Sequence, residues 1–163
     1  MKVTVEIENL CPDAWVPTRE EIEHWLAVAQ AKIDLRSPAS TLSLCFVDVE
    51  AAQALNNQYR GKDKATNVLS FPAEFEDSHK AVTAFNPLGD IAVCAPLVAA
   101  EAMEQGKELV AHWAHLLIHG LLHLHGFQHE EAAEATKMEA IETMILAELG
   151  FADPYQAGVA QTA

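Results

Sequence analysis

"AHWAHLLIHGLLHLHGFQH", residues 111–129, is the most informative stretch of this chain. Its apolar residues occupy most of the helical circumference, a pattern typical of a helix buried at the centre of a domain. We therefore expect a central helix from about residue 107 to 125. Gly126 can then adopt the left-handed conformation that lets the chain fold back beyond the helix.

The histidines of this stretch are spaced like metal ligands. His119 and His123 lie one turn apart on the same side of the helix, so both imidazoles can reach one ion. His129 follows the Gly126 turn and is placed to complete a triad. The alternative triplet with His115 fails, because His115 and His123 are roughly 12 Å apart along the axis whereas Zn–N bonds are about 2 Å. His115 is better placed to support a ligand or to face the substrate.

Two interpretations of the histidines in this helix are possible. Histidines near a helix end also interact favourably with the negative end of the helix dipole, which would give a metal-free protein. The spacing HxxxHxxGxxH, with glycine where the turn is needed, favours a metal site instead. Three nitrogen ligands leave a fourth position open, as in catalytic zinc sites, whereas structural zinc usually has four ligands rich in cysteine. We predict one zinc ion per chain. His125 points away from these ligands and is expected to be exposed.

Gly120 departs from the similar pattern of zinc peptidases, in which glutamate follows the first histidine and serves as the general base. Without that carboxylate, peptide hydrolysis is disfavoured. Glycine inside a helix also costs about 1 kcal/mol relative to alanine, so it needs a reason. Room for a bulky substrate and close approach of a neighbouring strand are two such reasons, and the sequence does not separate them.

The rest of the chain predicts a single α+β domain over residues 1–163, a small mixed β-sheet packed against helices around the central metal-binding helix. Apolar spacing in the closing helix puts Met138, Ile141 and Ile145 on one face and acids outside. The stretch "FADPYQAGVAQTA" (151–163) is expected to be a frayed tail, disordered from about residue 155. The expected strands cover residues 2–8, 41–49, 66–72 and 88–94; the expected helices cover 17–35, 50–60, 96–105, 107–125 and 130–149; 73–87 is expected to be a surface loop.

Composition restricts the function. The formal net charge of -14 argues against a protein that coats nucleic acid non-specifically. The amino terminus alternates polar and apolar residues, unlike a secretion signal. The longest apolar stretch, "IAVCAPLVAA" (91–100), is well short of the roughly 20 residues that cross a bilayer. Three widely spaced cysteines indicate reduced thiols. We expect a soluble, cytoplasmic protein with no membrane partner.

A basic loop interrupts this acidic chain. Arg60, Lys62 and Lys64 supply three of the ten Lys and Arg residues within five positions. Such cations are often simply solvated. The functional interpretation is phosphate recognition, for which the planar, permanently charged guanidinium of Arg60 is suited.

Four segments together, "YRGKDKATNVLSFP" (59–72), "LGDIAVC" (88–94), "AHWAHLLIHGLLHLHGFQH" (111–129) and "LGFADPY" (149–155), resemble the YbeY family of bacterial metal-dependent endoribonucleases. The resemblance implies a zinc ion held by His119, His123 and His129, with Arg60 as the catalytically important basic residue. It also implies cleavage of single-stranded RNA, maturation of the 3′ end of 16S ribosomal RNA, a part in ribosome quality control, and the ribosome or ribosomal proteins as partners.

Two positions depart from the pattern of the family. Gln128 stands where members often have Asp, and Asn67 stands where many have Asp. Gln128 cannot act as a base or as a charged partner of a ligand, so such a role would not transfer to this chain.

The resulting hypothesis is hydrolysis with zinc as a Lewis acid, Arg60 stabilising transition-state charge, and Lys62 and Lys64 positioning the RNA backbone. His115 and Asp90 are candidates for the proton acceptor. Asp90 would equally suit a hydrogen bond to a ligand histidine, or the start of a strand. Three alternatives stay open: a metallopeptidase, a non-catalytic zinc-stabilised ribosome-assembly factor, and a metal-free fold with a histidine-rich helix.

Overall fold

The computed structural model describes residues 2–33, 39–72, 86–127 and 131–156. His129 and Gln128 therefore lie outside the described residues, as does most of the predicted loop at 73–87. Within the described ranges, no helix is long and apolar enough to cross a membrane.

A four-stranded mixed sheet forms the framework, with the strand order β1-β2-β4-β3. Strands β1 (Lys2–Asn9), β2 (Ala39–Val47) and β4 (Asn86–Cys94) run parallel to one another. Strand β3 (Val68–Pro72) pairs with β4 in the antiparallel sense and forms one edge. The expectation of a small mixed sheet packed against helices is confirmed.

The helices also lie where the sequence predicts them, with ends displaced by a few residues. Helix α2 is an example of a helix whose two ends are set by capping residues. The Asp48 side chain accepts a hydrogen bond of 2.8 Å from the backbone N–H of Ala51. Gly61 ends the helix in the left-handed conformation, at φ 70°. The helices are α1 (Arg19–Ile33), α2 (Val49–Arg60), α4 (Ala95–Gln105), α5 (Leu109–Leu124), α6 (Ala132–Glu148) and the short 3-10 helix η1 (Pro154–Gln156).

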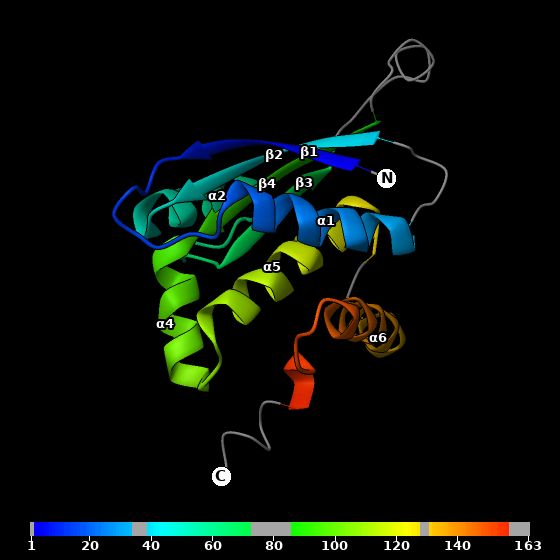
Figure 1. Cartoon of the computed structure of the whole chain (residues 1–163). Helices are drawn as coiled ribbons and strands as arrows, with labels where there is room; N and C mark the ends of the chain where they lie inside the picture. Colours follow the sequence, from blue (N-terminus) through cyan, green and yellow to red (C-terminus); the bar gives the residue numbers. More distant parts are fainter. Residues whose placement is uncertain (1, 34–38, 73–85, 128–130, 157–163) are drawn as a thin grey trace.

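Helices α1 and α5 pack against one face of the sheet, which we call the inner face, with α6 beyond them (Figure 1). Alternate strand residues such as Val5, Leu44 and Ile91 point into this layer and are buried. Helix α5 is buried on most sides, and its Trp113 meets Phe46 edge to face at 5.3 Å between ring centroids. The predicted central helix is therefore the middle of the core.

The carboxyl-terminal part corrects two expectations. The acids of α6 are not all outside, since Glu142 has an exposure of 0%. The frayed end predicted from about residue 155 is replaced, over residues 154–156, by η1. Residues 157–163 lie outside the described residues.

Close approach of a neighbouring strand explains Gly120. A Cβ at this position would lie 3.1 Å from Oγ of Ser70 on β3 and 3.2 Å from Cδ1 of Ile91 on β4. The Ser70 hydroxyl also donates a hydrogen bond of 3.0 Å to the Gly120 carbonyl. The space beside Gly120 is filled by the sheet, so the alternative of room for a substrate is not needed.

Replacing Gly120 by alanine should therefore destabilise the protein. Alanine gains about 1 kcal/mol of helix propensity, but overpacking against the buried Ile91 costs about 1–3 kcal/mol. We expect a net loss of roughly 1 kcal/mol in the free energy of unfolding, measured by urea titration. Ala140→Gly at an exposed position of α6 measures the difference in helix propensity between alanine and glycine without any packing effect. A Gly120→Ala protein that is more stable than the wild type would show that Ser70 and Ile91 can shift at little cost, and would contradict this account.

Candidate metal centre

His119 and His123 converge on one point beside α5. Their Nε2 atoms are 3.0 Å apart and their ring centroids 4.6 Å apart. Two nitrogens that each lie about 2 Å from one tetrahedral ion are separated by roughly 3.3 Å. The predicted pair of ligands is thus brought to nearly the separation that a shared ion requires.

The opposite ring nitrogen of each histidine is held by an acceptor. Nδ1 of His119 lies 2.5 Å from Oε2 of Glu142, and Nδ1 of His123 lies 2.8 Å from the carbonyl oxygen of Phe127. A carboxylate and a carbonyl only accept hydrogen bonds, so both Nδ1 atoms carry the proton. Each Nε2 then directs its lone pair toward the shared point, as in a neutral metal-binding imidazole.

The turn at Gly126 supplies one of these acceptors. Gly126 has φ 93°, and its N–H donates to the carbonyl of His123 at 3.0 Å. The reversal brings the Phe127 carbonyl back to the His123 ring. The glycine that was predicted to form a turn therefore also fixes the orientation of a candidate ligand.

Glu142 is the centre of a buried hydrogen-bond cluster. Its carboxylate faces Nε2 of His115 at 3.3 Å and Nδ1 of His119, and it accepts a hydrogen bond from the Tyr155 hydroxyl. Burial alone would raise the pKa of Glu142, but the hydrogen bonds from His115, His119 and Tyr155 lower it to about 2. Glu142 is therefore an anion at neutral pH.

Tyr155 closes the cluster from η1. Its hydroxyl lies 3.1 Å from Nε2 of His115 and also reaches Glu142, whereas the residue as a whole is 45% exposed. Burial raises the pKa of the Tyr155 hydroxyl well above its ordinary value, and the hydrogen bond to the Glu142 anion raises it further. Tyr155 thus remains a neutral donor.

His115 is separate from the converging pair, in agreement with the distance argument from the sequence. Its ring centroid is 6.3 Å from that of His119, and its Nε2 faces Glu142. Its Nδ1 is buried and has no hydrogen-bond partner among the described residues. His125 was expected to be exposed but is half-buried, with Nε2 2.7 Å from Oε1 of Gln30.

Two of the three predicted ligands are thus placed together. The described part of the chain contains no group of three His, Cys, Asp or Glu side chains able to hold a metal ion. His129, the third predicted ligand, is not among the described residues. The orientation of the pair fits a divalent ion that accepts imidazole ligands, and the complete triad stays a prediction.

The basic residues lie at the end of α2 and in the loop after it. Arg60, Lys62 and Lys64 are all exposed. Asn56, which is buried, donates 2.8 Å to the Lys64 carbonyl and so fixes the path of the loop. Among the described contacts, none joins these cations to the histidines.

Edge strand β3 connects the two regions. Ser70 points toward α5 and donates to Gly120. The next residue, Phe71, points to the other face of the sheet and meets Tyr59 of α2 with ring centroids 5.0 Å apart. This short strand therefore contacts both the helix that carries Arg60, through Phe71 and Tyr59, and the helix that carries the histidines, through Ser70 and Gly120.

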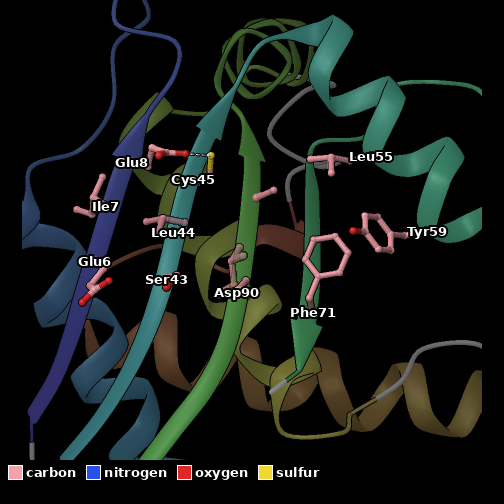
Figure 2. A pocket seen from close by; sticks show the side chains of 12 residues that line it. Glu6, Ile7, Glu8, Ser43, Leu44, Cys45, Leu55, Tyr59, Phe71 and Asp90 are labelled. Atoms are coloured by element: carbon pink, nitrogen blue, oxygen red, sulfur yellow. Dashed lines mark hydrogen bonds between the residues drawn. The ribbon is translucent and has the colours of Figure 1, made fainter. Parts of the chain in front are cut away.

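Asp90 is not near the histidines, which corrects its candidacy as a proton acceptor or ligand partner. It is exposed on the outer face of the sheet, whereas the next residue, Ile91, faces α5. Figure 2 shows Asp90 with Glu6, Glu8, Tyr59 and Phe71 around a hollow. The volume of this hollow is about 730 Å³. Three carboxylates and no cation line this hollow, among the described residues.

A second histidine–carboxylate pair lies nearer the start of α5. Nε2 of the buried His112 is 3.0 Å from Oε1 of Glu101, and the Asn67 amide donates to both carboxylate oxygens at 3.0 and 3.3 Å. Burial raises the pKa of Glu101, but the hydrogen bonds from His112 and Asn67 outweigh it and lower the pKa below 4.5. This pair ties the end of the basic loop to α4 and α5.

Glu142 and Tyr155 were not predicted from the sequence. The sequence does contain an indication that Glu142 is buried. This residue stands on the apolar face of α6, four residues after Met138 and three before Ile145. An acid on a buried stripe needs a partner. Tyr155 carried no such signal, since its contacts depend on how η1 folds back on α6.

Fold and site together define an α+β protein in which a buried carboxylate orients one of two converging imidazoles. The endoribonuclease YbeY family model matches residues 7–150. The chain belongs to the endoribonuclease YbeY family, and it is a nuclease of the hydrolase class.

Individual relatives agree with this assignment. Endoribonuclease YbeY of Stenotrophomonas maltophilia (strain R551-3) is 47% identical over 155 residues, which cover 95% of this chain and 94% of the relative. The protein of the same name from Halorhodospira halophila is 48% identical over 143 residues, covering 88% and 90%. A solution structure of a Thermotoga maritima protein shares the fold, with TM-score 0.55 and 22% identity, and covers 90% of this chain and 91% of that one.

The Glu101 pair predicts a pH-dependent stability. A carboxyl whose pKa is lower in the folded state than in the unfolded state stabilises the fold above the unfolded value, near 4.5, and loses that effect as the pH falls through the folded value. Glu101→Gln should cost about 1–3 kcal/mol at pH 7 and progressively less below pH 4, measured by urea unfolding. Glu104→Gln on the same helix is exposed and should change stability little at either pH. An equal cost at all pH values would contradict this account.

Proposed function

We propose that this protein is a zinc-dependent endoribonuclease that cleaves single-stranded RNA, matures the 3′ end of 16S ribosomal RNA and takes part in ribosome quality control. Membership of the endoribonuclease YbeY family supports the reaction class. The observation that carries the metal dependence is the 3.0 Å approach of the two Nε2 atoms of His119 and His123.

His119 and His123, with His129 as the third ligand, would hold one ion per chain. Three imidazoles suit zinc and leave an open coordination position. The bound ion would supply Lewis acidity to a phosphate oxygen or lower the pKa of a water molecule. The residues contribute the orientation: Nδ1 of each described ligand is already occupied by Glu142 or by the Phe127 carbonyl.

The cations of the α2 end and its loop provide the phosphate contacts in this proposal. Arg60 stabilises negative charge that develops on the scissile phosphate, and Lys62 and Lys64 hold the RNA backbone. The acidic hollow on the outer face of the sheet repels phosphate, since Glu6, Glu8 and Asp90 line it. RNA therefore approaches along the basic loop and not over the acidic hollow.

The proton acceptor is not Glu142, because a fully buried carboxylate does not touch substrate. His115 was a candidate for a catalytic role. Its side chain is 12% exposed and its Nε2 is engaged with Glu142 and Tyr155. This arrangement favours a role of His115 in holding the cluster together. In this proposal the proton acceptor is water or a group of the substrate.

The partners that follow from this role are ribosomal RNA and the ribosome or its proteins, in the cytoplasm. Asn67, one of the two departures from the family pattern, donates its amide to Glu101. An amide donates there where a carboxylate would repel the Glu101 anion. This chain therefore uses Asn67 to anchor the loop.

Neither alternative activity has a supporting contact among the described residues. For a metallopeptidase, a base beside the ion is needed, but Gly120 packs against Ser70 and Ile91 and offers none. A non-catalytic zinc-stabilised assembly factor would bind the ion and leave RNA intact, so it is an outcome of the following test.

Replacing His123 by alanine should remove both metal and activity. We expect zinc content to fall from about one ion per chain, and cleavage of a single-stranded RNA to drop by at least about 100-fold, because a ligand is lost. His24→Ala, on the exposed side of α1, is the matched control and should change neither. Cleavage that persists in His123→Ala would come from a contaminant or from another site. Zinc binding without cleavage by the wild type would support the assembly-factor alternative.

Arg60→Ala should separate catalysis from metal binding. We expect kcat on single-stranded RNA to fall by roughly 100-fold with zinc content unchanged, because only transition-state charge stabilisation is removed. Lys32→Ala, a cation of α1 paired with Glu148, should leave kcat unaltered. Unchanged cleavage by Arg60→Ala would remove this residue from the mechanism.

A further inference from the structure

We propose that Glu142 and Tyr155 are positioning residues: the Glu142 carboxylate holds His119 in its ligand orientation, and the Tyr155 hydroxyl holds the carboxylate. The inference deepens the proposed function and depends on it for the metal, because it states how the ligand is kept ready to bind. Neither residue contacts the shared point of the imidazoles in this account.

The first step is the geometry around the carboxylate. Oε2 of Glu142 lies 2.5 Å from Nδ1 of His119, while Oε1 faces Nε2 of His115 at 3.3 Å and the Tyr155 hydroxyl. Each oxygen therefore has its own donor. A carboxylate held on both oxygens cannot rotate, so the His119 ring is fixed in tautomer and direction.

The second step is that Tyr155 is itself held in place. The Asp153 side chain accepts a hydrogen bond of 2.8 Å from the backbone N–H of Tyr155. Asp153 also accepts one of 3.4 Å from the Thr143 hydroxyl on α6, next to Glu142 in sequence. The turn into η1 is thus pinned to the helix that carries the carboxylate, and the hydroxyl arrives from a defined direction.

The third step concerns what the cluster does to the ligand. A carboxylate that accepts from Nδ1 makes the opposite Nε2 a better electron donor and orients its lone pair. Among the described residues, Nδ1 of His123 faces a neutral carbonyl, that of Phe127. The two ligands are therefore supported unequally, and the charged support belongs to His119.

The chain contains a matched control for this role. The Glu101 side chain is 25% exposed, so this carboxylate is less buried than that of Glu142. Like Glu142, it is hydrogen-bonded to a histidine of α5, but its partner is His112 instead of a candidate ligand. A structural role alone predicts that both carboxylates matter in the same way. A positioning role predicts that only Glu142 affects metal binding.

The experiment compares Glu142→Gln, Tyr155→Phe and Glu101→Gln with the wild type. Zinc affinity is measured by competition with a chromogenic chelator, and the tautomer of His119 by ¹⁵N NMR of the metal-free protein. We expect zinc affinity to fall about 10- to 100-fold in Glu142→Gln and about three- to tenfold in Tyr155→Phe. The Nδ1–H preference of His119 should be lost or weakened in Glu142→Gln, and Glu101→Gln should change neither readout.

Wild-type affinity and an unchanged His119 tautomer in Glu142→Gln would overturn the proposal. An equal loss of affinity in Glu101→Gln would overturn it too, since loosening of the fold would then suffice. If Glu142→Gln does not fold, Tyr155→Phe is used instead, because Tyr155 is 45% exposed whereas Glu142 is fully buried. Wild-type zinc affinity in Tyr155→Phe would then overturn the proposal. A wild type that binds no zinc would defeat the proposed function, whereas the metal-free tautomer would still decide whether Glu142 positions His119.

Discussion

Helix α5 can lie directly on strands β3 and β4 because residue 120 has no side chain. The contact with Ser70 and Ile91 sets both the depth and the rotation of the helix. That rotation turns the side of α5 that carries His115, His119 and His123 away from the sheet and toward α6, where the Glu142 carboxylate lies. The close packing on one side of the helix thus determines which chemistry is possible on the other.

Much of this arrangement is already present in local sequence patterns. The i, i+4 spacing of His119 and His123 predicts their convergence from helix geometry alone, and the apolar circumference of 107–125 predicts a central helix. The strand and helix positions follow from the periodicity of apolar residues along the chain. These predictions agree with the structure because each depends on residues that lie within a few positions of one another in the sequence.

The remainder depends on contacts between distant segments. Alternation places Asp90 on the face opposite to Ile91, but it does not tell on which face the histidine helix packs, so the separation of Asp90 from the histidines appears only in the fold. Gly120 fits either a substrate or a strand beside it until β3 is seen there. Glu142 resembles the surface acids of α6 in residue type, and only its position on the apolar stripe marks it as different. Periodicity predicts which residues share one face of a helix or strand. It does not predict which other element packs against that face, because this depends on tertiary packing.

Strand β3 has a consequence for the fidelity of folding. Its neighbouring residues Ser70 and Phe71 serve opposite faces of the sheet, one against the histidine helix and the other against the helix that ends in Arg60. Because side chains alternate along a strand, a slip of one residue would exchange them and drive an aromatic ring into Gly120. A misregistered strand would therefore disrupt the packing on both faces of the sheet at once.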